Sequence, residues 1–405
     1  IIQVLAPGFT DNKEAYELAV HFGKIIFPYI IFISLAAHFA SINNVHERFA
    51  AGAFAPAILN ISFILSLFVL TPLLPSAGHA LSYGVLVGGV LQFLYLYWTV
   101  LKFYRPRIRI PILNDKLKKF FRLFLPGVVG SGVIQLNIVI GTIIASFLPV
   151  GAISHIYYAD RLNQLPLAIF GIALGIVLLP NLSKAIKQSD QETTHNIQNR
   201  SIEFSLLISL PSAIGLFILA EPIIYILFER GAFLQEDTFY TARVLGYFAL
   251  GLPAYIIIKV LVSCFFARED TKTPLYISLV SVISNIVLSL LLIGSMREMG
   301  IALATAISAW INALLLYLLL FTRGFLKFDS LLIRNSIKIL LSSALLIFGI
   351  FGLKGILFDD FSANSILINS LSLFLMIFLV LIIYLVLVIV LKVLTINQLK
   401  QYLKK

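Results

Sequence analysis

Two adjacent charged residues, Asp160 and Arg161, interrupt a long part of the chain that otherwise lacks Asp, Glu, Lys and Arg. The charge-free stretch before them covers 123–159, and the one after them covers 162–183. Arg161 is about ten residues into a predicted apolar helix, so it lies roughly 15 Å from the helix end. A guanidinium at that depth in a bilayer is costly unless an acid, water or an anion reaches it. Its planar donors suit bidentate binding of a phosphate.

The alternative is a structural Asp160–Arg161 pair. Adjacent helical residues point about 100° apart, which is a poor geometry for pairing. Three more basic residues lie in or near predicted spans, and Lys24, about two turns into its helix, can extend to the interface. Lys259 either faces a cavity or pairs with a neighbouring helix, whereas Arg243 lies near a helix end from which it can also extend to the interface.

The sequence lacks the motifs that other kinds of chemistry require. No cysteine or histidine cluster has metal-ligand spacing, and no phosphate-binding loop of the Walker type is present. No nucleophile, histidine and acid are arranged for hydrolysis. We therefore predict a protein that is not an enzyme and that needs no cofactor or metal.

Composition places these residues in a membrane. The chain has 405 residues, of which 60% are hydrophobic and 12% are charged, whereas soluble proteins carry about 25% charged residues. This excludes a soluble enzyme, a disordered protein and a disulfide scaffold, and the single cysteine, Cys264, has no partner in the chain. The net charge of +11 suggests nucleic acid at first. Its basic residues cluster in short loops, however, which is typical of membrane proteins and predicts no nucleic-acid binding.

About eleven apolar segments are long enough to cross a bilayer. The spans predicted from the sequence are 18–43, 52–72, 79–103, 117–148, 151–183, 201–226, 239–266, 274–294, 299–322, 333–356 and 364–392. Basic residues concentrate in every second loop, and acids in the others. The basic loops should be cytoplasmic. This places the C-terminus inside and residues 1–17 outside, so we expect further helices to precede Ile1.

Helix-breaking residues follow the charged pair closely. Pro166, Gly171 and Gly175 lie on the same predicted helix as Arg161. Glycine and proline are common at packing interfaces of membrane helices. Interrupted helices also form the binding sites and bending points of transporters. Their position directly after Arg161 favours a hinge.

One segment of the sequence is specific enough to indicate a protein family. The stretch YYADRLNQLPLAIFGIALGIVLLPNLSKA at 157–185 resembles the signature of the MurJ/MviN family. LAPGF at 5–9, LFERGAFLQEDT at 227–238 and FFAREDTKTPLYIS at 265–278 resemble other parts of that family in the same order. The resemblance implies an all-α, polytopic, two-lobed helical bundle of the MOP/MATE superfamily, with about eleven of an expected fourteen helices in this chain.

The resemblance also implies a division of the chain. Residues 1–104 would be the remainder of the N-lobe, with 105–115 a basic amphipathic cytoplasmic linker. The C-lobe would cover 116–325, and two helices over 331–395 would form a groove for a lipid tail. Residues 396–405 would be a basic cytoplasmic tail.

The function implied is that of a flippase in the bacterial inner membrane. It would move lipid II, the undecaprenyl-pyrophosphate-linked peptidoglycan precursor, to the periplasmic leaflet by alternating access. Arg161 matches the family's arginine that contacts the pyrophosphate, and Gln164 stands where some relatives carry an acid. Asp160, Lys259 and Arg243 complete the predicted substrate site. Membrane lipids and the cell-wall synthesis machinery would be the other partners.

Sodium-dependent relatives supply a second set of positions. In this sequence they correspond to Gly141, Asn285, Ser289 and Thr305. None of the four carries a carboxylate, and a hard cation prefers charged oxygen ligands. We therefore predict weak sodium binding at most.

Two other functions fit parts of the sequence. A MATE-type exporter of organic cations, or an oligosaccharide-lipid exporter, would share the superfamily fold. An organic cation would require an acidic cavity, whereas the only deep acid, Asp160, adjoins a base. A scaffold without transport activity would have no reason to keep Arg161 facing water.

The charge pattern predicts a testable orientation. Residues 102–122 should be cytoplasmic and 227–238 external. In intact cells, an impermeant thiol reagent should label a cysteine at position 232 and spare one at position 112. Labelling at position 112 from outside would contradict the orientation.

Overall fold

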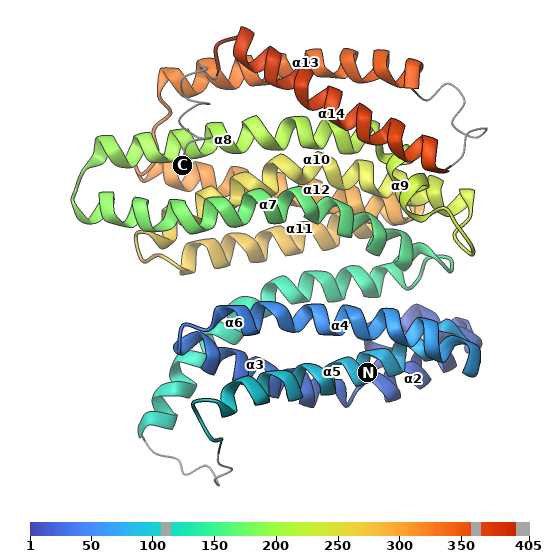
Figure 1. Ribbon diagram of the computed structural model, residues 1–405. Coiled ribbons are helices and arrows are strands. Elements are labelled where there is room, and N and C mark those ends of the chain that lie inside the picture. The colour runs from blue at the N-terminus through green and yellow to red at the C-terminus, as the bar shows by residue number, and fades with distance from the viewer. Residues whose placement is uncertain (107–114, 358–365, 394–405) are drawn as a thin grey trace. The chain divides into compact units, whose positions relative to one another are not determined.

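The computed structural model describes residues 1–106, 115–357 and 366–393, and its longer elements in these ranges are all α-helices (Figure 1). Most of the predicted linker 105–115 and all of the predicted tail 396–405 lie outside the described residues. The α-helices are α1 (Ile2–Leu5), α2 (Lys13–Ile26), α3 (Tyr29–Val45), α4 (Phe49–Leu70), α5 (Ala77–Leu101), α6 (Asp115–Ala145), α7 (Ala152–Lys187), α8 (Gln191–Ile218), α9 (Ala220–Phe228), α10 (Gln235–Phe266), α11 (Lys272–Met296), α12 (Glu298–Thr322), α13 (Ser330–Leu357) and α14 (Ile366–Val390).

The predicted membrane spans all fall on helices. Among the described residues, eight helices are long and apolar enough to cross a bilayer, and the bent pair α2–α3 makes a ninth. α6 and α7 coincide with the two remaining predicted spans, 117–148 and 151–183. The chain is thus an all-α, multi-pass membrane protein.

Two predicted single helices are interrupted. The span predicted over 18–43 is the pair α2 and α3, which meet at a 41° bend. Pro28 lies at this bend, where it has no N–H to continue the helix. The span predicted over 201–226 is divided at Leu219 into α8 and α9.

α8 also begins ten residues earlier than hydropathy predicts. Its first turn is polar, and the Asp190 side chain accepts a hydrogen bond from the Thr193 N–H at 2.9 Å. Such an N-cap satisfies a backbone donor that the helix itself leaves unpaired. The helix can therefore extend beyond its apolar part, where a hydropathy pattern cannot detect it.

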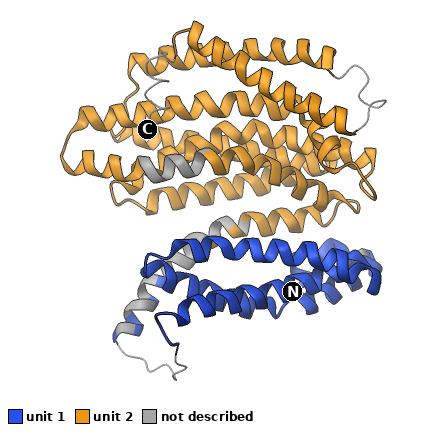
Figure 2. Cartoon of the chain, viewed as in Figure 1, with its two compact units in different colours: residues 1–126 blue, residues 127–405 orange. Residues whose placement is uncertain are grey.

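The chain divides into two compact units, residues Ile1–Pro126 and Gly127–Lys405 (Figure 2). The division falls within α6, near the end of the predicted linker. Each unit has its own packed interior. The assignment of these parts as transport lobes remains a prediction.

In unit 1, small residues let α4 and α5 approach closely. A Cβ on Gly84 would lie 2.2 Å from the Ser66 hydroxyl, and one on Gly88 would lie 3.1 Å from the Ser62 Cβ. The Ser62 hydroxyl donates to the Gly84 carbonyl at 2.8 Å. Close backbones with small side chains and interhelical hydrogen bonds are the usual means of joining helices in lipid.

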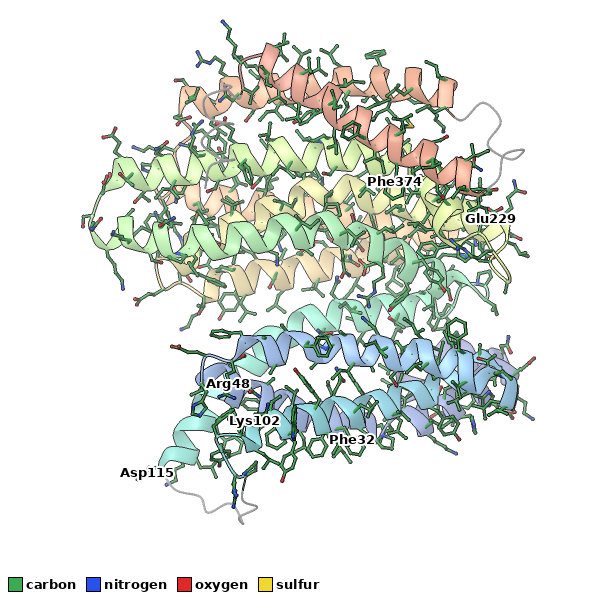
Figure 3. All side chains as sticks on the ribbon, in the orientation of Figure 1. Phe32, Arg48, Lys102, Asp115, Glu229 and Phe374 are labelled. Atoms are coloured by element: carbon green, nitrogen blue, oxygen red, sulfur yellow. The ribbon has the colours of Figure 1, made fainter. Side chains whose placement is uncertain are left out.

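Two basic side chains of unit 1 rest on aromatic rings where helices end. The guanidinium of Arg48 lies 4.6 Å from the Phe103 ring centroid, and the ammonium of Lys102 lies 4.1 Å from that of Trp98. Figure 3 labels Arg48 and Lys102 near one another. Both belong to the loops predicted to be cytoplasmic, and aromatic residues beside basic ones are typical of a membrane interface.

In unit 2, α10 is the central helix. It packs against α7, α8, α9 and α12, and its apolar window is the most buried of the candidate spans. A Cβ on Gly251 would lie 3.0 Å from the Ala306 Cα of α12. Further alanines on both helices, Ala254, Ala309 and Ala313, form a buried cluster. These small residues hold α10 and α12 at short distance.

A polar network connects the start of α13 to α8. Arg200 donates to both carboxylate oxygens of Asp329 at 2.8 Å and also pairs with Glu203. Asn335 of α13 donates to the other oxygen of Glu203 at 2.6 Å. The network satisfies buried polar groups on both helices and fixes where α13 leaves the bundle.

The loop between α10 and α11 contains a second polar contact. The Asp270 carboxylate accepts from the Thr273 N–H at 3.0 Å and from the Thr273 hydroxyl at 2.6 Å, and Arg323, directly after α12, donates to it at 2.9 Å. The hydrogen bonds from Thr273, with help from Arg323, hold the pKa of Asp270 below its usual range. They favour the ionised form of the Asp270 carboxylate and fix the residue at which α11 begins.

We expect Asp270→Ala to lower the free energy of unfolding by about 1 kcal/mol through loss of this cap, because the partly exposed Arg323 pair contributes little. A lowered pKa gives stability that is full above the unfolded value of about 4 and lost as the pH falls through the folded value. Unfolding in mixed micelles from neutral to acid pH measures both effects. Glu269→Gln, which removes only a neighbouring charge, is the control, and an equal loss in that variant would contradict the prediction.

Candidate functional site

A pocket of about 460 Å³ lies in unit 2 between α7, α10 and α12. It contains three of the five predicted substrate residues, Asp160, Gln164 and Lys259. Asp160 and Gln164 are one helical turn apart on α7, so they share a face. The complete lining is Asp160, Asn163, Gln164, Leu167, Ala168, Phe248, Tyr255, Lys259 and Thr305.

Asp160 and Arg161 use different partners. Asp160 is half-buried and accepts a short hydrogen bond from the Gln164 amide. The exposed Arg161 guanidinium lies 4.7 Å from the ring centroid of Tyr157, one turn earlier on α7. The sequence leaves two interpretations open: a structural Asp160–Arg161 pair, or an arginine that is available to a ligand. The observed partners of the two side chains favour the second.

Two buried polar atoms among the pocket residues lack a hydrogen-bond partner. They are the Tyr255 hydroxyl and the Asn163 side-chain oxygen. A buried polar group without a partner costs free energy unless water or a ligand satisfies it. The pocket is therefore suited to a polar occupant.

Tyr255 and Asn163 were not predicted from the sequence. Tyr255 lies one turn before Lys259, and Asn163 lies three residues after Asp160. Helical spacing from the charged residues was the available signal for both. A polar residue inside an apolar helix is common enough that spacing alone does not distinguish a pocket from a helix contact.

Arg243 does not share this pocket. It lines a separate pocket of about 370 Å³ with Glu221 and Tyr247, and its guanidinium lies 4.0 Å from the Phe239 ring centroid. Arg243 is exposed near the start of α10. The predicted group of five substrate residues is thus divided among three places in unit 2, because Arg161 lines neither of these two pockets.

The predicted hinge residues lie in one continuous helix. α7 runs from Ala152 to Lys187 with Pro166 and Pro180 inside it. Each proline removes one backbone hydrogen bond of the helix. Gly171 and Gly175 belong to the part of α7 whose packing lies outside the described residues. Bending at this site remains a prediction.

Three of the predicted sodium positions meet between α11 and α12. The Asn285 amide donates to the Thr305 hydroxyl at 3.0 Å, and the Ser289 hydroxyl donates to the Asn285 oxygen at 3.2 Å. Thr305 in turn donates to the Ile301 carbonyl at 2.8 Å. These groups satisfy one another, and the described part of the chain has no group of three acids, histidines or cysteines arranged for a metal. Nothing lies within 4 Å of a Cβ built on Gly141.

A third, apolar pocket of about 440 Å³ lies where α13 and α14 meet α8. Leu207 and Pro211 of α8, Leu346 of α13, and Val380 and Tyr384 of α14 line it. The Tyr384 hydroxyl donates to the Leu207 carbonyl at 2.7 Å, which holds α14 against α8. α14 also carries exposed apolar side chains, among them Phe374, which Figure 3 labels.

Comparison with known proteins identifies close relatives. The sequence matches the family described as lipid II flippase MurJ over residues 1–377. A protein of Rhizobium tropici described as a probable lipid II flippase MurJ is 41% identical over 349 residues, which cover 85% of this chain and 65% of the relative. The chain thus spans 65% of the length of that curated relative.

Two solved structures share the fold. A structure titled lipid II flippase MurJ, inward closed conformation, matches with a TM-score of 0.77 and 28% identity, covering 93% of this chain and 75% of that one. An inward-facing MATE family transporter of the MOP superfamily matches with a TM-score of 0.68 over 80% of this chain. Its identity is 14%, so that likeness concerns the fold alone.

Two neighbouring lining residues of α7 differ in exposure and give a direct test of whether the pocket is aqueous. Gln164 is exposed, whereas Asn163 is 3% exposed. We expect a cysteine at position 164 to react with a charged methanethiosulfonate reagent at least about tenfold faster than one at position 163, because only the thiolate in water reacts. The native Cys264 is buried and serves as the unreactive background. Equal, slow reaction at both positions would show that the pocket excludes water.

Proposed function

Because the chain belongs to the lipid II flippase MurJ family, we propose that it moves lipid II from the cytoplasmic to the periplasmic leaflet of the bacterial inner membrane. The family is shown by the match over residues 1–377. This chain carries the pocket on which the proposed activity is argued. Transport of this kind makes and breaks no covalent bond.

The observation that supports this proposal most directly is the polar pocket between apolar helices. Lys259 contributes a positive charge to it, and Arg161 follows the pocket residue Asp160 directly in the sequence. Polar and charged groups at membrane depth are expensive, and transporters place them where a polar substrate passes. A pyrophosphate group linked to a lipid is such a substrate.

In the proposed mechanism, Arg161 and Lys259 bind phosphate oxygens. Arg161 offers the planar donor pair, and Lys259 offers a point charge. The Gln164 amide holds the Asp160 carboxylate by a hydrogen bond, so this acid is restrained beside Arg161 without pairing with it. The Tyr255 hydroxyl and the Asn163 oxygen, which lack partners, can bind the sugar or peptide part of the head group.

The apolar pocket at α13 and α14 would receive the undecaprenyl tail. Its lining by leucine, valine, isoleucine and proline side chains suits a hydrocarbon chain. Pro166 of α7 also lines this pocket. The helix that carries the phosphate-binding arginine thus contacts the predicted tail groove, and bending at Pro166, Gly171 and Gly175 would couple the two.

The other proposed partners are membrane lipids and the cell-wall synthesis machinery. A MATE-type exporter has the same fold, yet the pocket with Asp160 also contains Lys259. A basic residue in the pocket opposes binding of an organic cation and favours an anion. We therefore retain lipid II as the substrate.

Replacing Arg161 tests the proposed function. In the full-length protein, Arg161→Ala should abolish lipid II translocation and growth of cells that depend on it, while insertion and expression stay normal. Arg161→Lys should restore little, because lysine lacks the paired planar donors. Translocation can be measured by the exposure of lipid II to an external enzyme.

Arg243→Ala is the matched control. Arg243 is also an exposed arginine stacked on an aromatic ring, but it lines a different pocket from that of Asp160 and Lys259. We expect this variant to keep its activity. Normal translocation by Arg161→Ala would show that the arginine is structural, and loss of translocation by Arg243→Ala would extend the site to the second pocket.

A further inference from the structure

A buried cluster of charged residues joins the first turns of α7, α10 and α12, away from the pocket. His155 of α7 has its Nδ1 atom 3.0 Å from a carboxylate oxygen of Glu298 and its Nε2 atom 3.0 Å from one of Asp237. The His155 side chain is 6% exposed, that of Glu298 is fully buried, and that of Asp237 is 31% exposed. One histidine ring therefore connects three helices of unit 2.

The geometry determines how many protons the cluster holds. A carboxylate accepts and does not donate, so each of the two hydrogen bonds requires a proton on the histidine nitrogen or on its partner. The guanidinium of Arg297 lies 3.4 Å from the second Glu298 oxygen and favours the ionised carboxylate. His155 is then an imidazolium between two carboxylates, with Arg297 balancing the remaining charge.

The surroundings hold this ring in place. Tyr240 stacks on the His155 ring with a centroid distance of 5.7 Å, and its hydroxyl accepts from Arg297 at 2.9 Å. Gly151, with φ of +103°, caps the start of α7, and a Cβ there would lie 3.4 Å from the ring. A residue with a side chain at position 151 would be strained by this positive φ.

The other elements around the cluster are mainly apolar. Ile144 of α6, Ile293 of α11 and Ile301 of α12 form a buried cluster with Ile153 and Ile156 of α7. The remaining acids of this region are Glu229, which accepts from Thr238 at 2.5 Å, and Glu236, which is exposed. Figure 3 labels Glu229 in the loop after α9.

Removal of one proton would change this contact. A neutral histidine would present a nitrogen lone pair to one of the two carboxylates, so one hydrogen bond would be replaced by repulsion. Glu298 has no route to water, because its side chain is fully buried. The partly exposed Asp237 is the side through which the proton can exchange with water.

We propose that His155 is a proton-binding site that fastens the start of α7 to α10 and α12, so that the external pH controls the position of this end of α7. Asp160 of the pocket lies five residues further along the same helix, and the pocket is lined by the same three helices. His155 is thus a positioning residue for the pocket. The proposal concerns the shape of unit 2 and does not depend on which substrate the pocket binds.

Hydrogen–deuterium exchange of the complete chain in lipid nanodiscs tests the proposal without a substrate. After correction for intrinsic rates, exchange of the first two turns of α7 should rise with pH by up to about tenfold per pH unit, once the second proton leaves. The range from about pH 5.5 to about pH 9 brackets the ordinary histidine value. His155→Gln should exchange fast at every pH, with no such slope.

His195→Gln is the matched control, because the His195 ring contacts the Gln198 amide oxygen at 3.3 Å rather than a carboxylate. It should keep the wild-type pH profile. A flat wild-type profile, or an equal slope in His155→Gln, would overturn the proposal. If His155→Gln does not fold, Asp237→Asn at the more exposed side should shift the slope to lower pH.

A spectroscopic measurement gives an independent answer. The chain contains six histidines, so selective 15N labelling can resolve their ring nitrogens. His155 should show two protonated nitrogens at neutral pH in the wild type and only one in Glu298→Gln. A single protonated nitrogen in the wild type would overturn the assignment of His155 as the proton-binding site.

Discussion

Hydrocarbon offers no hydrogen-bond partner, and this constraint determines where the chain places its polar side chains. Most of them bond within the protein: Ser62 to the Gly84 carbonyl, Gln92 to the Ala55 carbonyl and Asn285 to Thr305. Each such bond joins two helices that lipid alone would not hold together. Among the buried polar atoms without a partner, those of Asn163 and Tyr255 occur in the same pocket. The constraint thus explains the packing, and two of the buried groups that do not meet it lie in the pocket.

The same constraint separates two kinds of space in unit 2. The pocket between α7, α10 and α12 contains charged and polar groups, whereas the pocket between α8, α13 and α14 is almost entirely apolar. α7 contributes to both, through Asp160 on one side and Pro166 on the other. A substrate with a charged head and a hydrocarbon tail requires such a pair of spaces. The arrangement of the helices therefore provides separate spaces for a charged head and for a hydrocarbon tail.

Much of the fold could be predicted from the sequence, because the bilayer imposes a simple length and polarity rule. The eleven spans fall on helices, and the specific stretch at 157–185 indicates the family. The breaks at Pro28 and Leu219 and the polar first turn of α8 were missed, since hydropathy is insensitive to a bend or to a capped end. In the site, depth predicted Asp160 and Lys259. The separation of Arg243 and the roles of Asn163 and Tyr255 depend on which face of each helix meets a neighbour, which a single sequence does not specify.

The close approach of α10 and α12 has a consequence for how such a protein can diversify. Gly251, Ala254, Ala309 and Ala313 do not line the polar pocket, yet they set the spacing of two of its three walls. One added methyl group at these positions must separate the helices or bend one of them. Small residues behind the binding space thus determine its size. Related proteins can change what they accommodate while every residue that contacts the substrate stays the same.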